Sequence, residues 1–194
     1  MHHRTMRYEI AGHEFFGHDG QWVWYDLQTP RSDKFWLAGV NVENGKRLRY
    51  PLQRNEWSVH YNVSWDGKLF AGDGGGPDSV ANRTPLPDKR PLNPPGNGQW
   101  IYLFRPQNPT AKEIATEKNA RPHPGPLPQE RGKTADNFDE GKFEVEKLVD
   151  LSRHNYRLEP NLRFTPDGKW IVFRSNMHDA THVYAVEVAK AKGK

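Results

Sequence analysis

The stretch HEFFGHDGQWVWYDL, residues 13–27, contains two short apolar runs separated by the dipeptide Asp19-Gly20. Glycine adopts positive φ without strain and an aspartate side chain bonds to its own backbone, so this arrangement predicts a β-hairpin. The same shape returns in two later stretches, HYNVSWDGKLFAGDG (60–74) and PNLRFTPDGKWIVFRSN (160–176). Three hairpins of one design indicate an internal structural repeat.

A second pair of strands is expected after the first hairpin. KFWLAGVNV (34–42) and KRLRYPL (46–52) flank a predicted turn at residues 43–45, Glu-Asn-Gly. A hairpin and this pair make four strands, which is the content of one propeller blade. Gly20 and Gly67 lie 47 residues apart, within the ~40–50 residues typical of a propeller repeat.

The later repeats contain matching strand candidates, which are QWIYLFRP (99–106), FEVEKLVDL (143–151) and THVYAVEVA (181–189). We therefore predict an all-β fold. It is a single partial β-propeller over residues 1–194, with about three four-stranded blades. The blades are expected at about 8–54, 55–156 and 157–190.

Residues 110–140 do not fit this repeat and are expected to form a disordered insert in a surface loop. Within them, RPHPGPLPQERGK (121–133) has prolines too closely spaced for a paired strand or a helix. The preceding TAKEIATEKNA (110–120) is the one helical candidate, and it is short and polar. A polyproline II docking motif within 121–133 is the alternative.

The composition excludes several classes of site and partner. There is no cysteine, which rules out disulfides, thiolate metal sites and a cysteine nucleophile. The formal charge is +4 without a Lys/Arg run, so neither nucleic acid nor a membrane is an expected partner. The N-terminal residues have no apolar run of the kind a signal peptide needs, and a cytoplasmic or periplasmic location is expected.

Together, the three hairpins resemble the oligogalacturonate lyase family over most of residues 8–108 and 143–190. The most specific feature is the HEFF hairpin, followed one blade later by His-x-Asn and Gly-Asp-Gly. The resemblance implies a seven-bladed propeller that cleaves short pectin-derived oligogalacturonides by β-elimination with a divalent metal, usually manganese. In such chemistry the metal stabilises the negative charge that develops as a base removes the proton beside the uronate carboxylate.

The resemblance also implies a metal site, whose expected ligands are His13, His60, Asn62 and Glu56. His60 and Asn62 lie two residues apart, so a strand would point both to one side. Because the asparagine replaces a family histidine with a harder oxygen ligand, calcium or magnesium is an alternative to manganese. Gln53 is the alternative to Glu56. Asp73 is expected to form a turn, with a contact to a metal ligand as the alternative.

The family's catalytic base and a substrate-binding arginine belong to blades that precede the first blade seen here, and we identify no catalytic residue in this chain. The substrate-binding candidates are Arg54, Arg83, His154 and Tyr156. Arginine can pair with a uronate carboxylate through two hydrogen bonds.

Two further classes of function stay open beside that of a lyase fragment. One is a non-catalytic propeller module that binds other molecules, and the other is an inactive remnant of a split gene. If the chain works as a lyase, its expected partners are the oligogalacturonide substrate and the missing N-terminal blades. Self-association would be another way to extend the propeller.

Overall fold

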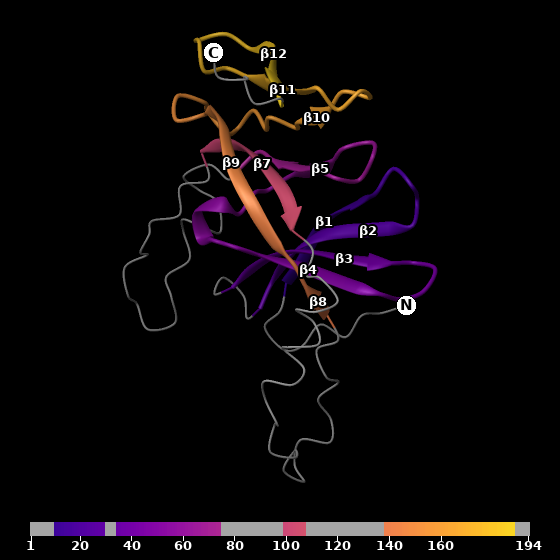
Figure 1. The fold of residues 1–194 in the computed structure, drawn as a ribbon. Coiled ribbons are helices and arrows are strands. Elements are labelled where there is room, and N and C mark those ends of the chain that lie inside the picture. The colour runs from indigo at the N-terminus through magenta and orange to yellow at the C-terminus, as the bar shows by residue number, and fades with distance from the viewer. Residues whose placement is uncertain (1–9, 30–33, 75–98, 108–137, 189–194) are drawn as a thin grey trace, which may run out of the picture.

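The computed structural model describes residues 10–29, 34–74, 99–107 and 138–188, which form three β-sheets (Figure 1). These residues are nearly all β, with one short 3-10 turn, η1 (Arg54–Glu56). No helix in this part of the chain is long and apolar enough to span a membrane. The predicted all-β class is confirmed.

The first sheet contains the hairpin that opens the sequence and the strand pair expected after it. Four of its five strands are antiparallel neighbours, and these are β1 (Ile10–Phe16), β2 (Trp22–Gln28), β3 (Phe35–Asn41) and β4 (Arg47–Leu52). The turn between the last two strands has Gly45 at φ 72°, a backbone conformation that glycine adopts without strain. The four strands predicted here are all present, and a fifth strand joins the same sheet.

The second sheet pairs segments that lie far apart in the sequence. Its strands are β5 (Tyr61–Val63), β6 (Phe70–Gly72), β7 (Trp100–Gln107) and β9 (Lys142–Asp150), all antiparallel. The predicted partnership of 99–106 with 143–151 is confirmed, because β7 and β9 are hydrogen-bonded neighbours. The third sheet contains β10 (Arg163–Phe164), β11 (Trp170–Ser175) and β12 (His182–Glu187), so the described residues supply three strands where four were expected.

The three predicted hairpin turns share one geometry. In each, a glycine adopts positive φ and the preceding aspartate accepts a hydrogen bond from the backbone N–H two residues further on. The glycines are Gly20 (φ 69°), Gly67 (φ 71°) and Gly168 (φ 69°), after Asp19, Asp66 and Asp167. The repeat in the sequence is therefore a repeat of turn chemistry.

One boundary of the expected insert is wrong. Residues 138–140 form strand β8 (Phe138–Glu140), which adds to the first sheet in parallel with β4. Its side chains explain the attachment, because the Arg49 guanidinium lies 5.3 Å from the Phe138 ring centre and pairs with Glu140. The stretches 110–120 and 121–133 lie outside the described residues.

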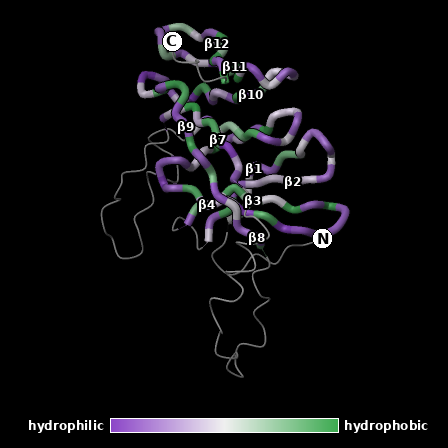
Figure 2. The backbone as a smooth tube through the Cα atoms, in the orientation of Figure 1, coloured by the Kyte–Doolittle hydropathy of each residue, from purple (hydrophilic) through white to green (hydrophobic). Residues whose placement is uncertain are grey.

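Two apolar cores join the three sheets, and the second sheet contributes to both with its two faces. Phe70 and Phe104 pack toward the first sheet, whereas the adjacent Ala71 and Leu103 pack toward the third. Figure 2 shows the hydrophobic and hydrophilic residues interleaved along the chain that makes these sheets. A sheet covered on both faces by neighbouring sheets is what a propeller blade requires, and the molecule is a partial β-propeller.

Candidate functional site

His13 lies on a β-bulge in β1. Gly12 pairs with Asp26 and Phe15 with Trp24, so His13 and Glu14 together oppose a single residue of β2. His13 itself has φ 52°, in the left-handed region that non-glycine residues rarely adopt. A bulge turns a side chain away from the regular alternation of a strand, and here it brings the imidazole back to Asp26. His13 Nδ1 lies 2.9 Å from Asp26 Oδ1.

His60 immediately precedes β5 and is held by Asp73, a carboxylate with no exposed surface. The Asp73 oxygens accept hydrogen bonds from the His60 backbone N–H (3.0 Å), from His60 Nδ1 (2.8 Å) and from the Tyr156 hydroxyl (3.1 Å). Asp73 therefore contacts a predicted metal ligand, as the alternative reading of the sequence had it.

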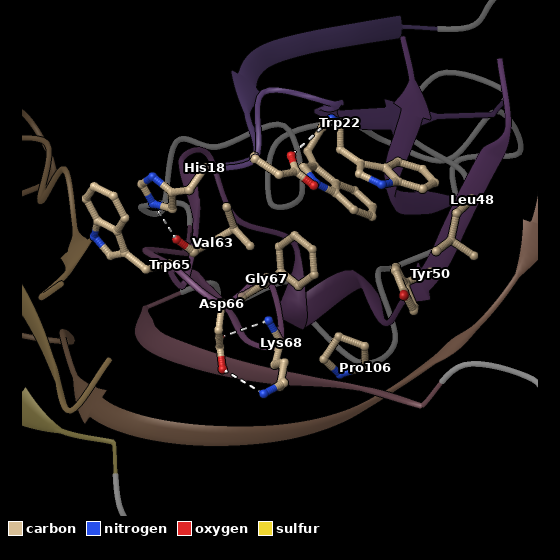
Figure 3. Close-up of a pocket in the computed structure, with 14 residues that line it drawn as sticks. His18, Trp22, Leu48, Tyr50, Val63, Trp65, Asp66, Gly67, Lys68 and Pro106 are labelled. Atoms are coloured by element: carbon tan, nitrogen blue, oxygen red, sulfur yellow. Dashed lines mark hydrogen bonds and ion pairs between the residues drawn. The ribbon is translucent and has the colours of Figure 1, made fainter. Parts of the chain in front are cut away.

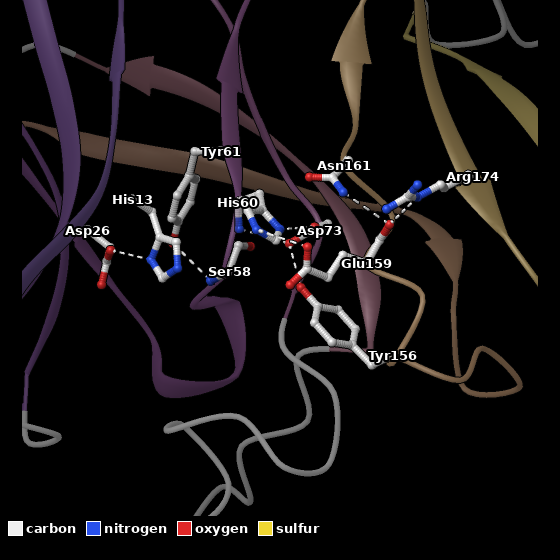
Figure 4. Close-up of polar contacts among 10 residues, drawn as sticks. All are labelled: His13, Asp26, Ser58, His60, Tyr61, Asp73, Tyr156, Glu159, Asn161 and Arg174. Carbon is white, nitrogen blue, oxygen red and sulfur yellow. Dashed lines mark hydrogen bonds and ion pairs between the residues drawn. The ribbon is translucent and has the colours of Figure 1, made fainter.

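The two histidines face each other across the junction of the first and second sheets (Figure 4). Their ring centres are 5.5 Å apart and the ring planes are 81° to one another. Each ring donates a hydrogen bond from Nδ1–H to a buried carboxylate, so each Nε2 lone pair is left for a proton or a metal ion. The hydrogen bond to Asp26 raises the pKa of His13, and the one to Asp73 raises the pKa of His60, both against the opposing effect of burial.

The other two predicted ligands are engaged elsewhere. The Asn62 side chain is 5% exposed, and its oxygen accepts a hydrogen bond from the Phe164 backbone N–H at 3.0 Å, which links the second sheet to the third. Glu56 accepts a hydrogen bond from the Gln53 N–H at 2.7 Å, and burial raises its pKa. Within the described segments, no three histidine, aspartate or glutamate side chains already lie in an arrangement that could hold a metal ion.

The predicted substrate-binding residues are scattered. The Arg54 guanidinium lies over the Phe35 ring, 5.2 Å from its centre, and Arg83 is outside the described residues. His154 is 7% exposed, and its Nδ1 lies 2.9 Å from the Ser175 hydroxyl. Burial lowers the pKa of His154. A side chain buried in this way gives no support to a contact with substrate. Tyr156 acts on the site through Asp73 instead, since its hydroxyl donates to that carboxylate.

Glu159 approaches His60 from the loop before the third sheet, and the sequence did not single it out. Its Oε2 lies 4.0 Å from His60 Nε2, on the ring nitrogen that Asp73 leaves unused. A glutamate in a polar loop carries no periodicity or motif, so only the packing of the third sheet on the second reveals this neighbour.

A separate pocket of about 510 Å³ lies between the hairpin turns of the first two sheets (Figure 3). Aromatic side chains line much of it, and at its edge the His18 ring stacks on Trp65 at 4.3 Å. None of the predicted site residues that the structure describes lines this pocket. Its aspartates, Asp19 and Asp66, accept the backbone hydrogen bonds of their own turns.

No family model and no curated protein matches the chain. Among solved structures, an oligogalacturonate lyase in complex with manganese matches with a TM-score of 0.59 and 17% identity, covering 95% of this chain and 37% of that one. An oligogalacturonate lyase from Vibrio parahaemolyticus matches with a TM-score of 0.60 and 16% identity, covering 97% of this chain and 38% of that one. The chain thus spans less than two fifths of these lyases, and the likeness supports the predicted resemblance at the level of a lyase-like propeller fold.

Proposed function

We propose that this chain is the metal-binding part of an oligogalacturonate lyase-like protein, which cleaves pectin-derived oligogalacturonides by β-elimination. The observation that carries the proposal is the pair formed by His13 and His60, which come from adjacent sheets and are each backed by a buried carboxylate. The likeness in fold to a lyase whose structure contains manganese supports the same proposal.

We propose the two histidines as ligands of a divalent cation. An imidazole that binds a metal through Nε2 needs its other nitrogen hydrogen-bonded to an acceptor, and Asp26 and Asp73 are such acceptors, 2% and 0% exposed. Imidazole with oxygen ligands suits manganese, and calcium or magnesium remains the alternative where oxygen dominates. We leave Asn62 and Glu56 out of the proposed set of ligands because Asn62 Oδ1 and Glu56 Oε2 each already accept a hydrogen bond from a backbone N–H.

A bound cation would polarise the uronate carboxylate and so acidify the neighbouring proton. The residues of this chain would hold that cation at a fixed place, with Asp26 and Asp73 setting the tautomer and the direction of the two rings. We identify no base among the described residues. We propose that further blades supply it, so that elimination needs more than these residues.

Manganese binding by the purified chain tests the proposal. Isothermal titration calorimetry should show Mn²⁺ binding that is lost when His13 and His60 are both changed to alanine. His178→Ala is the matched control, because His178 is an exposed histidine of the third sheet region that bonds to Tyr184. An unmodified chain that binds no Mn²⁺, or a double variant that binds as well as the control, would contradict the proposal.

A further inference from the structure

The aromatic pocket between the hairpin turns of the first two sheets lies away from the two histidines (Figure 3). In the β5–β6 hairpin, Gly67 forms the turn at one end, and the Asp73 N–H donates to the His60 carbonyl at the other. The pocket volume of about 510 Å³ is within the range of small-molecule sites. We infer that this pocket is a second binding site, which takes the pyranose ring of a neutral saccharide. The inference does not depend on the proposed metal site.

The floor of the pocket is apolar and is shared by the two sheets. Trp24 and Tyr50 come from the first sheet, and Val63 and Phe70 come from the second. All four side chains are buried, and the ring centres of Trp24 and Phe70 are 4.7 Å apart in an edge-on contact. These residues belong to the core that joins the two sheets, so the floor is formed before any ligand binds.

Two separate aromatic stacks border this floor. The His18 ring stacks on Trp65, with ring centres 4.3 Å apart and planes within 6°. His18 Nε2–H donates to the Val63 carbonyl at 3.1 Å, which holds this stack in place. Trp22, drawn apart from this pair in Figure 3, stacks on Trp24 at 5.2 Å. The pocket therefore presents flat, fixed aromatic surfaces to a ligand.

The turns themselves do not require these aromatic residues. The residue before the Asp-Gly pair is His18 in the first turn, Trp65 in the second and Pro166 in the third, although all three turns have the same geometry. Trp65 is also 56% exposed. An exposed tryptophan that its turn does not need, at the edge of a cavity, is typical of a binding surface.

Polar groups of both signs lie at the edge of the pocket. Lys68 Nζ pairs with Asp66 Oδ2 at 3.3 Å, and an ammonium group has two further protons to donate. Asp19 Oδ1 accepts hydrogen bonds from the backbone N–H groups of Gln21 and Trp22, whereas no hydrogen bond within the described residues reaches its Oδ2. The edge of the pocket thus offers both donors and an acceptor.

A neutral sugar ring matches this combination of surfaces. The C–H faces of a pyranose are apolar and stack on flat aromatic rings, while its hydroxyl groups donate and accept hydrogen bonds around its edge. A uronate suits the pocket less well, because Asp19 and Asp66 outnumber Lys68 among the charged lining residues and would repel a carboxylate. A purely apolar ligand would leave the donors and the acceptor unused.

The test is a titration of the full chain with methyl β-galactopyranoside, followed by ¹H–¹⁵N NMR of the tryptophan indole groups, with EDTA present to keep metal ions out. We expect a saturable shift of the Trp65 indole signal. Trp65→Ala should raise the dissociation constant roughly 3- to 10-fold. Trp170→Ala is the matched control, because Trp170 is 41% exposed on β11 and lies outside the pocket. Circular dichroism melting checks that each variant keeps its fold.

A second pair of variants tests the polar edge. Lys68→Gln should raise the dissociation constant roughly 2- to 10-fold, because one hydrogen-bond donor to the sugar is weakened. Lys169→Gln is the control. Lys169 follows the Asp-Gly pair of the third turn and pairs with Asp167 at 3.8 Å, as Lys68 does with Asp66 at 3.3 Å. Its substitution should leave sugar binding unchanged.

Several outcomes would overturn the inference. The absence of a saturable shift would do so, as would unchanged affinity in Trp65→Ala. Tighter binding of digalacturonate at the same indole signal would make the pocket a site for acidic sugars, and tighter binding of choline would make it a site for organic cations. None of these results bears on the proposed metal site, because Mn²⁺ binding tests that site separately.

Discussion

The two histidines of the candidate site are placed by different physical means. His13 depends on its own backbone, since a bulge and a φ of 52° turn its side chain toward Asp26. His60 has no positive φ and depends on Asp73, whose two oxygens accept three hydrogen bonds. One position rests on local strain and the other on a buried polar network.

The comparison shows that a histidine beside a strand can be positioned either by an unusual backbone conformation or by hydrogen bonds to a buried carboxylate. The first sheet stores strain in a backbone conformation that the surrounding ladder enforces, and His13 stays 44% exposed. The second sheet buries a carboxylate that accepts three hydrogen bonds, and His60 is 25% exposed. Substitutions of Asp26 and Asp73 should therefore have unequal effects on the stability of the protein and on its metal affinity.

The largest effect is expected at Asp73. Asp73→Ala would leave the His60 N–H, His60 Nδ1 and the Tyr156 hydroxyl without their acceptor in a buried setting. The free energy of unfolding should fall by roughly 3 kcal/mol, because buried donors without partners are costly. Urea denaturation measures this loss. Tyr156→Phe removes one of the three donors and should cost less, and an equal loss for both variants would show that Asp73 is not the centre of the network.

A smaller effect is expected at Asp26, on metal affinity more than on stability. Asp26→Asn should weaken Mn²⁺ binding about 10- to 100-fold, because the imidazole of His13 loses the carboxylate that orients it and sets its tautomer. Calorimetry measures the affinity, and ¹⁵N chemical shifts report the tautomer of His13, which a purely structural role for Asp26 would leave unchanged. Asp179→Asn, at an exposed turn position, is the control. Unchanged affinity and tautomer would remove Asp26 from the site.

The smallest effect tests the strain at His13 directly. His13→Gly should be more stable than His13→Ala by about 1 kcal/mol, because glycine alone adopts φ 52° without steric cost. At His60 the order should reverse, since glycine there only adds freedom to the unfolded chain. Thermal or urea unfolding of the four variants gives both differences. If the alanine variant is more stable than the glycine variant at both positions, the bulge does not strain His13.

Much of the fold could be predicted because its turns are encoded locally. Asp-Gly at residues 19–20, 66–67 and 167–168 fixes three hairpins, and the apolar runs beside them supply strands with two packed faces. The pairing of β7 with β9 was also predictable, because both segments have strand composition and the second sheet needed two more strands. Strand β8 was not predictable, since its parallel attachment to β4 depends on contacts of Arg49 with Phe138 and Glu140.

The candidate site could be predicted only in part. His13 and His60, which are one repeat apart in the sequence, lie with their ring centres 5.5 Å apart, and their role as metal ligands stays a prediction. The contact of Asp26 with His13 could not be predicted, because it depends on a β-bulge for which the sequence HEFF gives no signal. Asn62 is buried, and its side-chain oxygen accepts a hydrogen bond from the Phe164 backbone N–H, which links the second sheet to the third. This use of Asn62 could not be predicted from its spacing to His60.

By itself, the sequence determined the repeat, the turn geometry and the two histidines one repeat apart, because turns and strand alternation depend on neighbours along the chain. Only the tertiary structure decided which carboxylates support those histidines and that Glu159 approaches His60. Each carboxylate supports a histidine of its own sheet. The contact of His13 with His60 joins the first sheet to the second, and the contact of His60 with Glu159 joins the second sheet to the loop before the third. These two contacts depend on the packing of whole sheets through the two apolar cores.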